Sequence, residues 1–240
     1  MNKKKIGLAL STGGARGLSH IGVISTLQDN NIPIDYISGT SMGAIIAVYY
    51  ALNLEVKSLQ KLILNMTKRD YLKLIDINNP KKSIIKGNKI RNFLKKVFRN
   101  KSFTDTKIPL MLSATSLNDA SLVILDKGKL HEAAMMSAAY PGVFPPIKYK
   151  GKYLIDGGVV DPCPIDLAFK MGAKKVIGVD LWTEKFSKDV KPNLRSTLER
   201  TFNILLTNLS IYKEKEYKKN VFLLKPKADS RSNTFSFQNA

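Results

Sequence analysis

The sequence predicts an α/β fold in which helices cover both faces of a mainly parallel sheet. Short apolar segments alternate along the chain with longer segments of helical spacing. Several short segments, among them residues 6–11 and 175–181, are almost wholly apolar, as strands buried on both faces are. The chain has 240 residues, 44 % of them hydrophobic and 24 % charged, which is enough to bury a large core. No stretch has a linker's composition, so we expect a single domain over residues 1–240.

The N-terminal part of the chain predicts two strand–loop–helix units. A strand over residues 6–11 precedes a glycine-rich loop, and a helix follows over 20–27, where Ile21, Ile24 and Leu27 share one face. A second strand over 35–38 leads through another glycine-rich turn into an apolar helix over 44–52. These two turns follow strands directly, which is where α/β folds carry their chemistry.

The rest of the chain continues the alternation. The basic stretch after residue 54 is mostly helical, and residues 88–100 form an amphipathic helix within it. We predict further strands over 109–114, 122–125, 153–155, 175–181 and 221–224, and helices over 130–139, 165–171 and 194–219. The motifs described below lie in a core of about residues 6–181, and a helix, a strand and a polar tail occupy 194–240.

The charge of the chain is large and unevenly distributed. The 39 Lys and Arg exceed the 19 Asp and Glu by 20, and residues 55–109 alone carry 15 basic and 4 acidic side chains. Such a field favours anionic partners, either phospholipid surfaces or nucleic acid. A compositional explanation also stands, because 32 Lys against 7 Arg, with 22 Ile and 17 Asn, is the bias of AT-rich coding.

The apolar face of the predicted 88–100 helix allows two interpretations. It lies in the interface of an anionic membrane, which residues 55–109 would then contact peripherally, or it packs on the domain, which we favour. Aromatic residues are 8 %, no nucleic-acid motif occurs, and Lys rather than Arg dominates, so we expect no specific nucleic-acid partner. The single cysteine, Cys163, cannot form an intrachain disulfide, so we expect a cytoplasmic location, with or without peripheral contact with a membrane.

The first loop that could carry catalytic residues is Gly39-Thr40-Ser41-Met42-Gly43, a G-x-S-x-G pattern between a predicted strand and a predicted helix. Small residues around the serine permit a tight strand-to-helix turn that lifts the hydroxyl out of the backbone. The positive end of the following helix favours developing negative charge beside Ser41. We therefore expect a nucleophile there, with a purely structural turn as the alternative.

The second loop is 12–17, Thr-Gly-Gly-Ala-Arg-Gly, directly after the first strand. The amides of Gly13 and Gly14 can converge on an anion there, and Arg16 adds a positive charge nearby. An oxyanion hole, a phosphate cradle and a glycine turn without a ligand all fit this pattern. A dinucleotide fingerprint does not fit, because Thr12 occupies the first glycine position, and no Gly-Lys-Ser/Thr completes a P-loop.

The third loop is Asp156-Gly157-Gly158, again after a short strand. A serine nucleophile needs a base, and the chain has only His20 and His131, each in a helical pattern that favours packing over catalysis. An aspartate that hydrogen-bonds the serine directly is a candidate base if desolvation raises its pKa. An ordinary Asp-Gly turn is the alternative. No cluster of His, Cys and carboxylates has metal-ligand spacing, so we expect neither a metal nor another cofactor.

Four motifs in order, GGARG at 13–17, GTSMG at 39–43, AAYPGVFPP at 138–146 and DGG at 156–158, resemble those of patatin-like phospholipases of the compact bacterial type. The resemblance covers about residues 6–181 and implies a three-layer α/β/α sandwich with a Ser/Asp dyad and no catalytic histidine. It makes Ser41 the nucleophile and Asp156 the base. It also implies an oxyanion hole from Gly13, Gly14 and Arg16, supported by further motif glycines at Gly17, Gly39, Gly43, Gly157 and Gly158.

The sequence departs from the family pattern at three supporting positions. Thr12 stands where glycine is usual, Ser116 where aspartate is common and Asp161 where asparagine is common. The predicted function is a lipid acyl hydrolase of phospholipase A type that cleaves carboxylic esters, with a lipid or ester substrate as its partner. The alternative is a weak or inactive relative that binds anionic membrane, nucleotide or nucleic acid.

Overall fold

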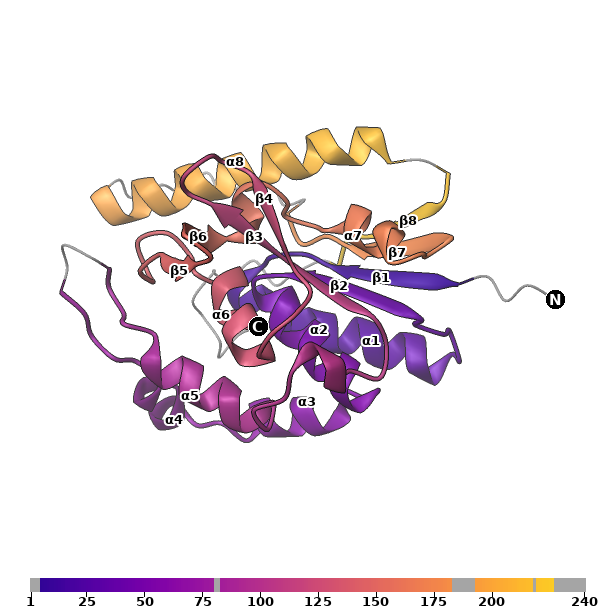
Figure 1. Cartoon of the computed structure of the whole chain (residues 1–240), viewed down its shortest axis with the longest axis horizontal. Coiled ribbons are helices and arrows are strands. Elements are labelled where there is room, and N and C mark those ends of the chain that lie inside the picture. The colour runs from indigo at the N-terminus through magenta and orange to yellow at the C-terminus, as the bar shows by residue number, and fades with distance from the viewer. Residues whose placement is uncertain (1–4, 80–82, 183–192, 218, 227–240) are drawn as a thin grey trace.

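A computed structural model describes residues 5–79, 83–182, 193–217 and 219–226 of the chain. Within these ranges the strands form one eight-stranded sheet with the order β5-β6-β3-β2-β1-β7-β8, and β4 pairs with β3 off this path (Figure 1). The parallel strands are β1 (Ile6–Leu10), β2 (Tyr36–Thr40), β3 (Leu110–Ser116), β7 (Lys175–Val179) and β8 (Val221–Leu224). The antiparallel strands are β4 (Leu122–Leu125), β5 (Ile147–Tyr149) and β6 (Lys152–Asp156).

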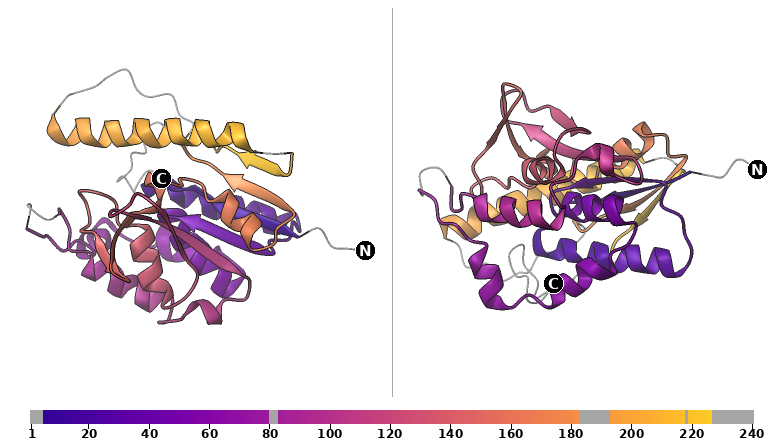
Figure 2. Two further views of the ribbon diagram at one scale, coloured as in Figure 1. Left: turned by 45° about the horizontal axis from the view of Figure 1, so that its top comes forward. Right: turned by 60° about the horizontal axis from the view of Figure 1, so that its bottom comes forward.

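Helices cover both faces of the sheet, as Figures 1 and 2 show. One face carries α1 (Ser19–Asp29), α2 (Met42–Asn53), α3 (Lys57–Leu64), α4 (Lys68–Lys73), α5 (Asn88–Val97) and α6 (Leu130–Ser137). The other face carries α7 (Ile165–Lys170) and α8 (Leu194–Glu216). Three short 3₁₀ helices complete the described structure: η1 (Gly14–Leu18), η2 (Phe103–Asp105) and η3 (Gly157–Val159). The predicted three-layer α/β/α architecture is thus confirmed.

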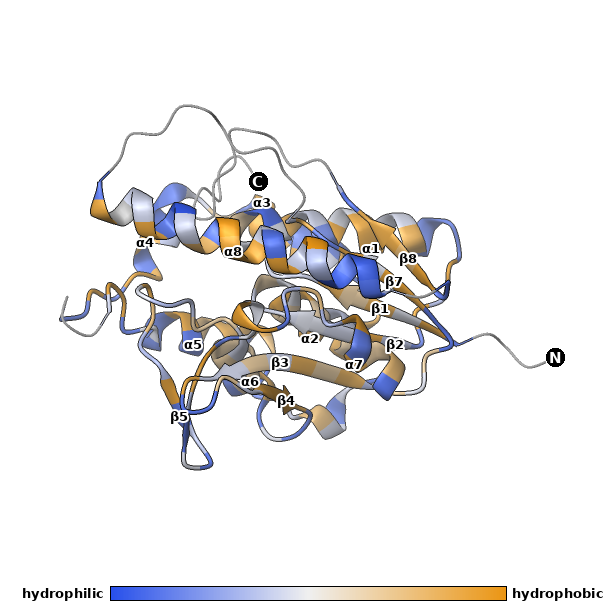
Figure 3. Ribbon diagram, turned by 90° about the horizontal axis from the view of Figure 1, so that it is seen from above, coloured by the Kyte–Doolittle hydropathy of each residue, from blue (hydrophilic) through white to orange (hydrophobic). Residues whose placement is uncertain are grey.

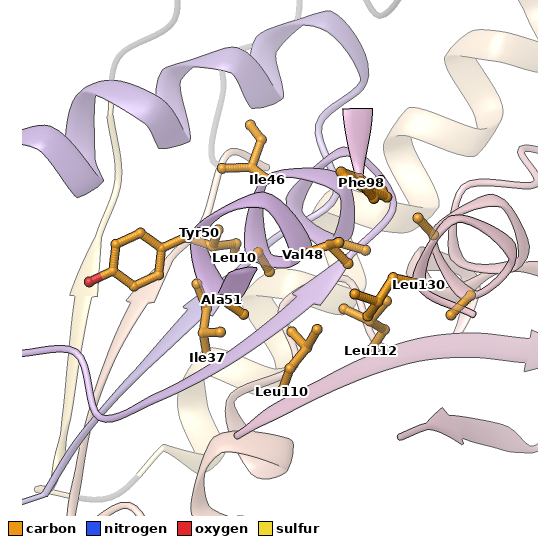
Figure 4. Close-up of a cluster of buried hydrophobic side chains, with 14 of the residues drawn as sticks. Leu10, Ile37, Ile46, Val48, Tyr50, Ala51, Phe98, Leu110, Leu112 and Leu130 are labelled. Carbon is orange, nitrogen blue, oxygen red and sulfur yellow. The ribbon is translucent and has the colours of Figure 1, made fainter. Parts of the chain in front are cut away.

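The core divides into two clusters because side chains alternate along each buried strand. In β1, Leu8 and Leu10 join the larger cluster under α2, whereas Ala9 joins a smaller cluster that includes Ile165 and Ala168 of α7. Figure 4 shows the larger cluster, where Val48 of α2 lies among residues of β1, β2 and β3. Burial on both faces explains why these strands are almost continuously apolar in sequence.

Several element boundaries differ from the predictions. β2 extends to Thr40, because its ladder with β3 continues as far as the Thr40–Ser113 pair. α5 ends at Val97, and Arg99 and Asn100 then have positive φ angles that break the helix. α8 ends at Glu216, since Tyr217 is extended with ψ of 129°. The strand β5 was not predicted. Most of the predicted polar tail lies outside the described residues.

The basic helix α5 packs on the domain, which is the interpretation that we favoured for residues 88–100. Leu94 and the C-cap residue Phe98 are buried in the main core. Ile90, Phe93 and Val97 are partly buried against the same core. The apolar face of α5 is therefore used internally. Among the described helices, none is both long enough and apolar enough to cross a bilayer.

Candidate active site

Strands β2 and β6 bring two of the predicted loops together at one edge of β3. Thr40, the last residue of β2, pairs with Ser113, and Asp156, the last residue of β6, pairs with Ala114. β4 occupies the opposite edge of β3 along both stretches, because it pairs with residues 112–115. β2 runs parallel to β3 and β6 runs antiparallel to it, so their carboxyl ends meet tip to tip.

Ser41 follows β2 in a sharp turn that requires glycine on both sides. Its backbone has φ 59° and ψ −121°, which few non-glycine residues adopt and which marks a strained position between strand and helix. A Cβ on Gly39 would lie 2.5 Å from the carbonyl oxygen of Gly43, and a Cβ on Gly43 would collide with the Leu10 and Ser11 carbonyls. Only glycine at 39 and 43 lets helix α2 start this close to the sheet.

The hydroxyl of Ser41 donates a 2.6 Å hydrogen bond to Oδ2 of Asp156. Oδ1 of the same carboxyl accepts the Gly158 amide at 2.8 Å, which fixes its orientation. Asp156 is only 1 % exposed. Burial raises the pKa of Asp156 to about 6, against the opposing hydrogen bonds from Ser41 and Gly158. A carboxyl with this pKa is ionised at neutral pH and is more basic than an exposed aspartate.

Two serine hydroxyls that the sequence analysis missed hold the ends of this turn. The amide of Ser41 donates to Oγ of Ser137, at the end of α6, over 2.9 Å. Thr40 Oγ1 and Ser113 Oγ share a hydrogen bond of 2.5 Å on β2 and β3. Gly157 packs directly on Ser113, where a Cβ would collide. No sequence signal marked Ser137, because its role depends on where α6 packs.

The glycine loop lies next to the Ser41 turn. Gly14 has φ of 55° and lines the same cavity as Ser41 and Thr12. In the described part of the chain, the amides of Gly13 and Gly14 have no hydrogen-bond acceptor. Gly17 lies against Met42, the residue after Ser41, and a Cβ there would collide with the Met42 side chain. Unpaired N–H groups in a loop that borders the cavity of the serine are the kind of donor from which an oxyanion hole is built.

Arg16 does not line this cavity. Its guanidinium stacks over the indole ring of Trp182, 4.6 Å from the ring centroid, and the residue is buried. The Trp182 indole donates to the carbonyl of Thr12 at 2.7 Å. The stack therefore links η1, the glycine loop and the end of the β7 segment. This geometry makes Arg16 a support of the loop.

Neither histidine contacts the Ser41–Asp156 pair. His20 is fully buried, its Nε2 lies 2.8 Å from the Ser11 carbonyl oxygen, and burial lowers its pKa to about 4. His131 is buried in α6, and burial also lowers its pKa. Both occupy packed positions, as their helical sequence context favoured. In the described ranges, no three His, Cys, Asp or Glu side chains lie close enough to hold a metal ion.

Ser41 stands at the wall of a cavity of about 650 Å³. The helices α2, α3, α4, α5 and α6 contribute to its lining, together with residues 138–144 and Trp182. Aliphatic and aromatic side chains dominate, and Lys68 is the one charged residue among those that line it in the described structure. A cavity of this size and polarity suits an apolar chain with one reactive polar group at its end.

Comparison with known proteins shows which family has this arrangement. The family model for patatin-like phospholipase matches residues 8–169. The chain belongs to the patatin-like phospholipase family. It is 31 % identical over 184 residues to lysophospholipase NTE1 of Candida albicans, a match that covers 75 % of this chain and 13 % of that protein. It is also 31 % identical over 189 residues to human patatin-like phospholipase domain-containing protein 6, covering 75 % and 13 %.

The fold is also similar to that of a solved structure. The chain aligns with VipD from Legionella pneumophila with a TM-score of 0.65 and 15 % sequence identity, over 96 % of this chain and 64 % of that one. The family membership expected from the four motifs is confirmed. The chain spans about an eighth of the length of the two curated relatives, so it corresponds to one part of them.

Proposed function

We propose that this patatin-like protein is a serine acyl hydrolase that cleaves carboxylic ester bonds of lipids, with Ser41 as nucleophile and Asp156 as general base. The 2.6 Å hydrogen bond between Ser41 Oγ and Asp156 Oδ2, at the wall of an apolar cavity, carries the proposal. It couples a hydroxyl to a buried carboxylate whose pKa is about 6. A hydroxyl activated in this way can attack a carbonyl carbon without histidine.

In the acylation step, Asp156 accepts the Ser41 proton while the hydroxyl oxygen forms a bond to the ester carbonyl carbon. The carbonyl oxygen becomes an oxyanion, which the amides of Gly13 and Gly14 stabilise. Collapse of the tetrahedral species breaks the bond to the alcohol oxygen, which takes the proton from Asp156 and leaves. The acyl group is then esterified to Ser41, with its chain in the cavity.

In the deacylation step, Asp156 accepts a proton from a water molecule that attacks the acyl-serine. The same two amides hold the second oxyanion, and Ser41 departs with the proton from Asp156. Loss of one oxyanion donor typically costs about 3 kcal/mol of transition-state stabilisation. The burial of Asp156 matters in both steps, because a carboxylate with an ordinary pKa is a weaker base.

The lipid class of the substrate rests on the cavity and on the relatives. A cavity of about 650 Å³ with an almost wholly apolar lining excludes strongly polar acyl groups and accommodates a long hydrocarbon chain. Two relatives are named for lysophospholipase and phospholipase activity, which supports the same class of substrate here. A non-catalytic binding module has no need of a carboxyl held at high pKa against a strained serine.

The test compares ester hydrolysis by the wild type, Ser41→Ala and the matched variant Ser121→Ala, which removes the hydroxyl of a half-buried loop serine that does not line the cavity. Substrates are p-nitrophenyl butyrate and a lysophospholipid, with the released fatty acid identified by mass spectrometry. We expect Ser41→Ala to lower kcat/KM by about 10⁴-fold or more and Ser121→Ala to leave it unchanged. Hydrolysis by purified Ser41→Ala at the wild-type rate would overturn the proposal.

A further inference from the structure

The mouth of the apolar cavity carries exposed aliphatic side chains. Leu62 of α3, Leu72 of α4 and the following Ile75 line the cavity and are also 38, 58 and 40 % exposed. Ile77 and Ile84, close by in the chain, are 80 and 52 % exposed. We define these five residues as the rim surface. Exposed aliphatic side chains grouped at one opening mark an interaction surface, whereas single exposed ones are common on any protein surface.

Main-chain contacts attach Ile77 and Ile84 to the cavity mouth. Ile77 forms an antiparallel bridge with Ile85, and the amides of Ile84 and Ile85 donate to the carbonyls of Gly142 and Val143 at 3.1 and 2.9 Å. Ile85 and Val143 both line the cavity. The exposed isoleucines therefore sit on the segment that forms one side of the cavity opening.

The described charges around the rim surface are predominantly positive. Residues 55–79 and 83–86 contain six Lys or Arg and three Asp or Glu. The three acids are engaged locally: Glu55 accepts the Ser58 amide, Asp70 caps α4 and pairs with Lys73 at 3.0 Å, and Asp76 accepts amides at the start of α5. In the described structure, the exposed cations Lys61, Lys68 and Arg69 form no ion pair.

We propose that the rim surface docks on an anionic lipid bilayer, so that a lipid passes from the bilayer into the cavity without crossing water. This inference rests on the proposed lipid hydrolase function. Exposed aliphatic side chains together with the exposed cations of α3 and α4 match the interfacial region of such a bilayer, where apolar burial and attraction to anionic headgroups act together. A second copy of this chain fits less well, because a two-fold contact would set like cations against each other.

The opposite side of the molecule offers a matched control surface. Helix α8 lies across the sheet from α3, α4 and α5 (Figure 1). The side of α8 that faces the viewer in Figure 3 also carries hydrophobic residues. Leu198 and Leu205 of α8 are 62 and 61 % exposed. α8 carries four basic and three acidic residues and does not line the cavity. Variants on α8 therefore test whether exposed apolar side chains alone direct binding to a bilayer.

The binding experiment uses vesicle flotation with phosphatidylcholine alone and with about 30 % phosphatidylglycerol, at low and high salt. Ser41→Ala is the background, so that lipid is not consumed. Ile77→Asp/Ile84→Asp is compared with Leu198→Asp/Leu205→Asp, which changes the net charge equally. We expect the Ser41→Ala parent protein to bind anionic vesicles. The rim variant should bind them about tenfold or more weakly than the parent, and the α8 variant should bind them as the parent does.

A second pair of variants tests the electrostatic part. Lys61→Glu/Arg69→Glu should weaken binding to anionic vesicles by about tenfold or more, while Lys170→Glu/Lys174→Glu, on the α7 side, should not. Equal binding to neutral and anionic vesicles would overturn the proposal. So would loss of binding in the α8 variant with full binding in the rim variant, or no vesicle binding by the parent protein.

Activity measurements separate this proposal from the proposed function. With Ser41 intact, the rim variant should hydrolyse p-nitrophenyl butyrate at the wild-type rate, because Ile77 and Ile84 do not line the cavity. Its rate on anionic vesicles should fall about as much as its binding. If the wild-type protein, with Ser41 intact, floats with vesicles through the rim surface but hydrolyses no ester, the docking proposal stands and the hydrolase proposal is refuted. Wild-type rates for the rim variant on vesicles refute the docking proposal alone.

Discussion

Replacement of Asp156 by Asn should stabilise the protein while it removes the proposed base. The carboxyl is buried, and its pKa is raised from the ordinary value of 3.8 to about 6, with desolvation as the largest cause. A shift of this size corresponds to about 3 kcal/mol of native-state destabilisation when the carboxyl is ionised. An asparagine is neutral at every pH, its carbonyl oxygen can still accept the Gly158 amide, and its NH₂ group can donate to Ser41.

The sign of the pH dependence follows from the raised pKa. Below pH 3.8 the carboxyl is protonated in both the native and the unfolded chain, so it contributes no difference. Between that pH and about 6 the native state binds more protons, and wild-type stability falls as the pH rises. Above about 6 the full penalty applies. The free energy of unfolding of Asp156→Asn should therefore exceed that of the wild type by about 3 kcal/mol at pH 8 and by only about 0.5 kcal/mol at pH 4.

Urea denaturation followed by circular dichroism at the two pH values measures this difference. Asp119→Asn serves as the control, because its carboxyl is exposed and its pKa is lowered, first of all by the hydrogen bond from Lys152. At pH 8 the free energy of unfolding of Asp119→Asn should be lower than that of the wild type, whereas that of Asp156→Asn should be higher. Equal stability of wild type and Asp156→Asn at pH 8, or the same gain at both pH values, would refute the reasoning.

Three further predictions follow from the site. The kcat/KM for an uncharged soluble ester should rise with pH through about 6 and level off above it, because only the Asp156 carboxylate accepts a proton; a pH profile that is flat from 4 to 8 contradicts this. Gly39→Ala should lower the unfolding free energy by about 3 kcal/mol, since the new methyl group meets backbone, whereas Gly22→Ala, in open space on α1, should raise it by about 0.5–1 kcal/mol. His131→Gln should change kcat/KM by less than about twofold, as a steady-state assay on soluble ester would show.

The sequence predicted those parts of the fold that depend on local pattern. Continuous apolar segments marked the central strands, and the glycines around Ser41 marked a turn in which a side chain would collide with backbone. The antiparallel end of the sheet was harder to predict, because strand periodicity does not encode direction. β5 has only three residues and pairs with β6 across Lys150 and Gly151, so no pattern of useful length distinguished it from a loop.

The chemistry at the sheet edge was predictable, and the surroundings of that chemistry were not. Ser41 and Asp156 stood out because each lies at the carboxyl end of a predicted strand, in a small-residue motif. The cavity walls come from α3, α4 and α5, whose helical spacing says which side is apolar but not what that side faces. Ser137 and Trp182 reach the site through tertiary packing alone. The cytoplasmic location remains a prediction.

The most direct test of the account is to map the covalent adduct of a fluorophosphonate by peptide mass spectrometry. We predict a single adduct on Ser41, formed faster as the pH rises through about 6, and slowed in Asp156→Asn by about a hundredfold or more. An adduct on another residue, or undiminished labelling of Asp156→Asn, would contradict activation of this serine by a buried carboxylate.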